Sequence, residues 1–182
     1  ADALAEWKGI CRRVDSYDGD DIAAGTNAEV CISENTSEIR VRVMEKILSI
    51  VIPAYNVEKY LEKCLASFEI QAILDRIEVL VINDGSKDHT AEIAQRYCEK
   101  YPETYFLYNK ENGGHGSGIN YGIRYATGKY FKVVDGDDWL NTEELEAFVK
   151  LLEETDTDIV AADFLCIQDE TDAILEEKHC TP

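Results

Sequence analysis

The sequence predicts an α/β domain of three layers, α/β/α, in which helices cover both faces of a Rossmann-like, mainly parallel sheet. Two observations carry this prediction. The apolar runs 47–53 and 77–82 are continuous rather than alternating, which is typical of strands covered on both faces. Each run is followed by a segment with apolar residues at helical spacing, and strands that alternate with helices form parallel sheets through crossover connections.

The first strand, 47–53, stops at Pro53, and Asn56 is expected to cap the helix that follows. The apolar stripe of this helix consists of Val57, Tyr60, Leu61, Cys64, Leu65 and Phe68. The second strand, 77–82, leads through a polar turn into a second helix, which Pro102 closes. The apolar face of the second helix consists of Ile93, Ala94, Tyr97, Cys98 and Tyr101.

A third strand is predicted at 105–108, and a glycine-rich segment separates it from a third helix at 117–127. Gly128 is well placed to terminate that helix. The fourth strand is expected at 130–134.

Asn141 is the expected cap of a fourth helix, with Glu144 as its capping-box partner and a hydrophobic staple between Leu140 and Leu145. A fifth strand is expected at 158–162.

Residues 1–45 differ from the rest in composition, and we treat them as an N-terminal extension of unknown role, separate from a domain at 46–182. The extension contains a polar acidic loop at 15–21 and an alternating segment at 38–43 that is typical of a half-exposed strand. Neither segment carries recognisable chemistry.

Composition excludes several functional classes. The net charge of −19 disfavours nucleic acid and anionic membrane surfaces as partners, so an anionic small ligand would need a metal ion or local backbone donors. The six cysteines show no CxxC spacing, which indicates neither a zinc site nor a disulfide framework and fits a reducing cytoplasm. No stretch approaches the apolar length of a transmembrane segment.

The fourth strand runs into three carboxylates within four residues, Asp135, Asp137 and Asp138, followed by Trp139. Carboxylates this close repel one another, and a divalent cation relieves the repulsion. Hard oxygen ligands suit Mg²⁺ or Mn²⁺, which can in turn hold a diphosphate. An EF-hand loop is excluded because Leu140 stands where its turn requires glycine, whereas a solvated acidic turn that caps the next helix remains open.

Ligands of such sheets bind at the carboxyl ends of the strands. Four distinctive segments fall at these ends: 53–56, 83–86, 112–118 and 135–139. Asp84 could accept hydrogen bonds from a base or a ribose, and the glycines of 113–118 could expose N–H groups to an anion or a sugar. Each segment also has an ordinary interpretation as a turn, and His115 receives no role.

Taken together, the four segments resemble the inverting family 2 glycosyltransferases of the GT-A fold, over about residues 46–163. The resemblance implies that Pro53, Ala54 and Tyr55 cradle the base of a nucleotide. It implies that Asp84 contacts the uracil or ribose with Asn83 beside it, and that Asn112, Gly113 and Gly114 pack near the nucleotide. Asp135 and Asp137 would hold Mg²⁺ or Mn²⁺ on the donor diphosphate, and Asp138 would orient the donor sugar or the water shell of the metal.

By the same resemblance, the domain transfers sugar with inversion from a nucleotide-diphospho-sugar, expected to be a UDP-sugar, to an acceptor hydroxyl. The acceptor would be a carbohydrate or lipid-linked molecule in cell-envelope or capsule polysaccharide synthesis. The expected location is cytoplasmic, with a peripheral position at the inner face of the membrane as a further option.

In this family the general base lies well beyond the metal-binding motif, and we can match it to no residue of this chain. We therefore expect a GT-A domain truncated at its C-terminal side, with the acceptor half largely missing. A catalytically incomplete nucleotide-sugar-binding module, or an acidic interaction module, remains an alternative. A sugar nucleotidyltransferase is less favoured, because it would carry a basic, glycine-rich loop where residues 53–56 stand.

Overall fold

The computed structural model of the chain describes residues 9–13, 28–30, 41–43, 45–168, 171 and 173–179. Within these residues the main sheet consists of β1 (Gly9–Arg13), β4 (Leu48–Ala54), β5 (Ile77–Asn83), β6 (Tyr105–Asn109), β7 (Tyr130–Val133) and β8 (Ile159–Ala162). The helices are α1 (Glu58–Ala66), α2 (Thr90–Lys100), α3 (His115–Tyr125) and α4 (Thr142–Glu154). Two short hairpins pair β2 (Ala28–Val30) with β3 (Val41–Val43) and β9 (Phe164–Ile167) with β10 (Ile174–Lys178).

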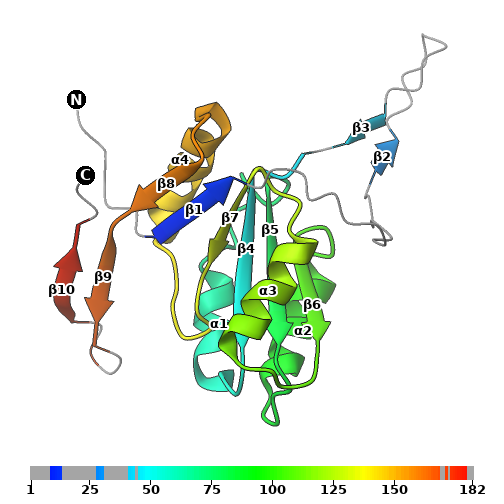
Figure 1. The fold of residues 1–182 in the computed structure, drawn as a ribbon, viewed down its shortest axis with the longest axis vertical. Coiled ribbons are helices and arrows are strands. Elements are labelled where there is room, and N and C mark those ends of the chain that lie inside the picture. The colour runs from blue at the N-terminus through cyan, green and yellow to red at the C-terminus, as the bar shows by residue number, and fades with distance from the viewer. Residues whose placement is uncertain are drawn as a thin grey trace.

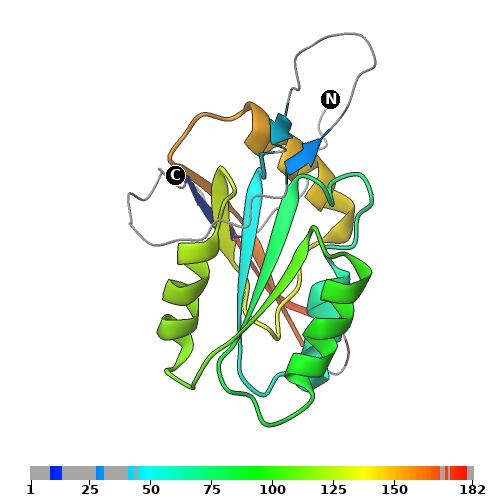
Figure 2. The same ribbon diagram turned by 90° about the vertical axis from the view of Figure 1, so that its right-hand side faces the viewer.

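The strand order of the main sheet is β6-β5-β4-β7-β1-β8. The four strands β6, β5, β4 and β7 are parallel to one another, whereas β1 is antiparallel to both β7 and β8 (Figure 1). Figure 2 shows α3 on one side of the sheet and α1 and α2 on the other. The predicted three-layer, mainly parallel α/β fold is therefore confirmed.

Residues 1–45 were not predicted to contribute to the main sheet, yet the backbone of β1 comes from this segment. Of the alternating segment 38–43, residues 41–43 form β3 and pair with β2. The acidic loop at 15–21 lies outside the described residues.

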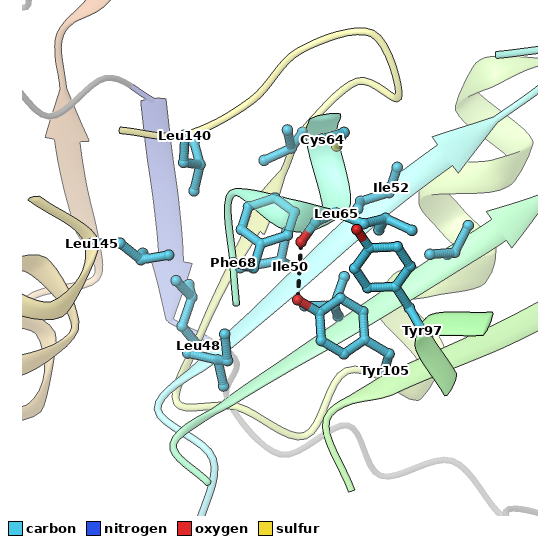
Figure 3. Packing of buried hydrophobic residues seen from close by; sticks show 14 of the residues in the cluster. Leu48, Ile50, Ile52, Cys64, Leu65, Phe68, Tyr97, Tyr105, Leu140 and Leu145 are labelled. Carbon is cyan, nitrogen blue, oxygen red and sulfur yellow. Dashed lines mark hydrogen bonds between the residues drawn. The ribbon is translucent and has the colours of Figure 1, made fainter. Parts of the chain in front are cut away.

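The main hydrophobic core lies between the sheet and α1, α2 and α4. In Figure 3, Leu48, Ile50 and Ile52 of β4 extend into this core together with Leu65 and Phe68. The hydroxyl of the fully buried Tyr105 donates a hydrogen bond of 3.0 Å to the carbonyl oxygen of Leu65, which satisfies its polar atom inside the core. A smaller cluster around Val51, Leu80 and Ile82 lies on the face that α3 covers.

The first helix begins differently from the prediction. Asn56 has a positive φ of 53° and does not cap α1; its Oδ1 accepts a hydrogen bond from the backbone N–H of Lys87 instead. Val57 occupies the N-cap position, and its N–H donates to Thr90 Oγ1 at 2.9 Å. Asp88 Oδ2 accepts from Glu58 N–H at 3.1 Å, so the segment leading into α2 supplies the capping acceptors of α1.

Gly128 does not terminate the third helix, which ends at Tyr125. A Cβ atom on Gly128 would lie 2.7 Å from the backbone nitrogen of Ser49, so glycine is required here for close approach to β4.

The fourth helix bears out the predicted cap but not the capping box. Asn141 accepts at 3.1 Å from the N–H of Glu143 rather than from that of Glu144. The staple residues Leu140 and Leu145 are both buried in the main core.

Within the described ranges, no helix has the length and hydropathy that crossing a bilayer requires.

Candidate functional site

The carboxyl ends of β4, β5, β6 and β7 lie at one edge of the sheet, the lower edge in Figure 1, because these strands are parallel. The fold thus brings all four predicted segments to the same edge. The order of the strands in the sheet differs from their order in the chain, because β5 and β7 lie on opposite sides of β4.

Asp84, directly after β5, is the best-anchored polar side chain of this edge. It is 3% exposed, and its Oδ1 accepts from Gly113 N–H at 2.9 Å while its Oδ2 accepts from Gly114 N–H at 2.8 Å. The ammonium group of Lys110 pairs with Oδ1 as well. These contacts hold the glycine-rich loop, residues 112–114, against the end of β5.

The environment of Asp84 stabilises its charged form. Burial by itself would raise the pKa of the carboxyl, but the hydrogen bonds from Lys110, Gly113 and Gly114 outweigh it and hold the pKa below its usual value. A carboxylate offers about four acceptor positions, and these donors occupy three of them.

Asn83 shapes the turn beside Asp84. Its Nδ2 donates to Asn109 Oδ1 at 2.8 Å, and its Oδ1 accepts from Ser86 N–H at 3.0 Å. Gly85 in the same turn has a φ of 74°, and a Cβ there would lie 3.1 Å from the backbone nitrogen of Asn112. The turn and the glycine-rich loop therefore pack directly against each other.

The segment after β4 offers one exposed ring. Pro53 and Ala54 are buried, and the carbonyl oxygen of Ala54 accepts from Asp84 N–H at 2.9 Å. Tyr55 is 48% exposed. Gly118 lets α3 approach this segment, because a Cβ there would lie 3.1 Å from Cβ of Pro53.

The acidic turn after β7 contains Asp135, Asp137 and Asp138, all of which are exposed. The N–H of Asp138 donates to the carbonyl oxygen of Asp135 at 2.9 Å. Between them, Gly136 is buried against α1, where a Cβ would lie 2.9 Å from Cγ2 of Val57. The turn therefore presents its carboxylates to solvent while its backbone packs on α1.

The three carboxylates create a negative field that helps to raise the pKa values of nearby groups. Desolvation, followed by the charges of Asp137 and Asp135, raises the pKa of Asp138, while Lys132 opposes the shift. Burial and the same carboxylates raise the pKa of the Cys64 thiol, which lies below the turn with its Sγ 3.8 Å from the carbonyl oxygen of Asp135. A cation at this turn would be favoured by the same field.

Within the part of the chain that the structure describes, no group of three or more His, Cys, Asp or Glu side chains could hold a metal ion. Asp135 and Asp137 can supply two ligands, and other ligands would have to come from a bound molecule and water. This donor set fits Mg²⁺ or Mn²⁺, which are commonly bound by one or two carboxylates plus phosphate oxygens.

His115, the first residue of α3, reaches across to the acidic turn. Its Nε2 lies 2.7 Å from Asp135 Oδ1. The glycine-rich loop and the residue that follows it thus contact both aspartates at the ends of β5 and β7.

Neither the contact of Lys110 with Asp84 nor a role for His115 was predicted from the sequence. Lys110 stands directly after β6, just as Asp84 stands directly after β5, and this position at a strand end was the available signal. The partner of His115 is 20 residues away in the chain, which no local pattern reveals.

Comparison with known proteins points to one family. The sequence model of Glycosyl transferase family 2 matches residues 49–179. The uncharacterized glycosyltransferase EpsJ of Bacillus subtilis (strain 168) is 36% identical over 121 residues, which cover 66% of this chain and 35% of EpsJ. The minor teichoic acid biosynthesis protein GgaB of the same organism is 36% identical over 116 residues, or 62% of this chain and 13% of GgaB.

Among solved structures, S. aureus TarS 1–349 in complex with UDP-GlcNAc superposes with a TM-score of 0.52 at 30% sequence identity. The match covers 59% of this chain and 31% of the TarS chain. The chain therefore spans about a third or less of the length of each of these three relatives.

Proposed function

The chain belongs to glycosyl transferase family 2, and on that premise we propose that it binds a nucleotide-diphospho-sugar and transfers the sugar, with inversion, to an acceptor hydroxyl. The observation that carries the proposal is the gathering of Asp84, the glycine-rich loop and the acidic turn at one edge of the sheet. EpsJ is a glycosyltransferase by name, GgaB is a minor teichoic acid biosynthesis protein by name, and TarS was solved with UDP-GlcNAc.

The nucleoside end of the donor is assigned to the segments after β4 and β5. The free acceptor position of Asp84 suits an N–H or O–H donor, such as the ring N–H of uracil or a ribose hydroxyl. The exposed ring of Tyr55 offers a surface on which a base can stack. Because Asn83 is engaged with Asn109 and Ser86, its part in the proposal is to shape the turn that presents Asp84.

The diphosphate end is assigned to the acidic turn. Asp135 and Asp137 would hold Mg²⁺ or Mn²⁺, and the metal would neutralise the charge that builds on the departing nucleoside diphosphate. Asp138 would orient the donor sugar or the water shell of the metal. Since two carboxylates make an incomplete metal site, metal and nucleotide should bind together rather than separately.

The acceptor side of the proposal stays general. An inverting transfer requires a base that deprotonates the acceptor hydroxyl, and we assign that role to no residue of this chain. We propose a carbohydrate or lipid-linked acceptor, and the name of GgaB, a minor teichoic acid biosynthesis protein, supports a role in cell-envelope synthesis.

Calorimetric titration of UDP, with and without Mn²⁺, tests the donor and metal assignments. We expect Mn²⁺ to tighten UDP binding in the wild type and to have little effect in Asp137→Ala. Asp75→Ala is the matched control, because Asp75 is an exposed carboxylate in the turn before β5, at the opposite edge of the sheet. UDP binding that is indifferent to both Mn²⁺ and Asp137→Ala would sink the metal–diphosphate assignment.

A further inference from the structure

We propose that His115 is a positioning residue that orients Asp135 toward the divalent cation and couples cation binding to the glycine-rich loop. This inference rests on the function proposed above, because it concerns the same site. It assigns a role to a side chain that neither the motifs nor the composition of the chain single out.

The geometry around the glycine-rich loop carries the inference. Three consecutive residues bridge two aspartates: Gly113 and Gly114 donate to Asp84, and His115 contacts Asp135. The bridge spans β4, because Asp84 follows β5 and Asp135 follows β7. Gly114 has a φ of 84°, a backbone conformation that glycine adopts readily, and it turns the chain from the loop into α3.

The chemistry of the contact suits a carboxylate that binds a metal. With a proton on Nε2, the imidazole donates a hydrogen bond to Oδ1 of Asp135 and leaves Oδ2 for the cation. Groups that hydrogen-bond a ligating side chain fix its orientation, and their loss commonly weakens metal affinity. Because the chain itself supplies only two carboxylate ligands, its affinity for the metal ion depends strongly on how those two carboxylates are oriented.

A second histidine of the chain provides an internal comparison. His89 Nδ1 lies 2.8 Å from Glu92 Oε2, three residues away on the exposed start of α2. The two pairs have similar lengths and exposed partners, but only the His115 pair joins segments from two different strand ends. Replacement of His89 therefore removes a comparable pair without touching the site.

The experiment measures the ratio of UDP affinities with and without Mn²⁺ by calorimetry in the full chain. We expect His115→Ala to lower this ratio by about tenfold or more, while UDP affinity without metal stays at the wild-type value. His115→Gln should restore most of the ratio, because its amide N–H can reach the position of Nε2. His115→Asn should not, because its shorter amide lies near the position of Nδ1.

His89→Ala should behave as the wild type, and circular dichroism should show the same folded signal for all variants. The inference is overturned if His115→Ala keeps the wild-type ratio, or if His115→Asn restores it as well as His115→Gln does. Failure of the proposed function looks different: Mn²⁺ would then leave UDP binding by the wild type itself unchanged.

Discussion

Oδ2 of Asp84 accepts a 2.8 Å hydrogen bond from the backbone N–H of Gly114, 30 residues further along the chain. Together with the bond from Gly113 and the pairing with Lys110, it fastens the glycine-rich loop to the end of β5. The same carboxylate is thus a structural anchor and the proposed contact of the nucleoside. Its charge should therefore affect both stability and binding.

Replacement of Asp84 by Asn should destabilise the fold in a pH-dependent way. At neutral pH we expect a loss of about 1–3 kcal/mol, because buried hydrogen bonds to a charged group are weakened. The folded-state pKa of Asp84 lies below its usual value, so its stabilising contribution is present above about pH 4 and is lost as the pH falls through the folded pKa. Urea denaturation from pH 7 to pH 3 should show that the difference in unfolding free energy between wild type and variant decreases below about pH 4. A difference that stays constant over this range would contradict the assignment.

Gly122 marks the closest approach of α3 to the sheet. A Cβ atom there would overlap the side chain of Val51, so Gly122→Ala should destabilise the protein by about 1–3 kcal/mol. Gly116→Ala in the first turn of the same helix is the matched control, because a Cβ there meets nothing within 4 Å. The control should be neutral or stabilising by up to about 1 kcal/mol. Thermal unfolding that ranks the two variants in the opposite order would refute this account of the packing.

Ser49 belongs to a buried polar network at the edge of the sheet opposite the site. Its Oγ donates to Glu78 Oε1 at 2.5 Å and accepts from Gly128 N–H at 2.8 Å. Ser49→Ala should cost about 1–3 kcal/mol of unfolding free energy, because it removes the acceptor of the buried Gly128 N–H and one donor to Glu78, which keeps its hydrogen bonds from Thr127. UDP affinity should not change. A variant as stable as the wild type in urea would mean that the network contributes nothing to the free energy of unfolding.

Removal of one carboxylate from the acidic turn should leave the metal-free protein as stable as the wild type or slightly more stable. Asp137 raises the pKa of Asp138, so Asp137→Asn relieves repulsion and should leave the melting temperature unchanged or slightly higher. Addition of Mn²⁺ with UDP at about 100 times the dissociation constant should stabilise the wild type by about 2.7 kcal/mol. The same addition should stabilise the variant much less. Equal thermal shifts for both proteins would count against Asp137 as a metal ligand.

Much of the fold and of the candidate site could be predicted from short stretches of sequence. Continuous apolar runs identified β4 and β5, because both faces of these strands are buried. Apolar stripes at helical spacing identified α1 and α2, because one face of each helix is buried. The four polar segments followed from the same reasoning, since the carboxyl ends of parallel strands share one edge. The predicted cap at Asn141 is confirmed, because an N-cap contact is local.

The sequence by itself therefore determined the strands, helices and strand-end loops between residues 47 and 162, whereas β1, β9 and β10 were not predicted. Only the tertiary structure decided how those loops contact one another: the pairing of Lys110 with Asp84, the contact of His115 with Asp135, and the capping of α1 by Thr90. These contacts join residues 20 to 33 positions apart, and they form because the strand order places β5 between β6 and β4, and β7 beside β4. Apolar periodicity records whether a residue is buried, but the partner of a polar side chain depends on strand order, which periodicity does not encode.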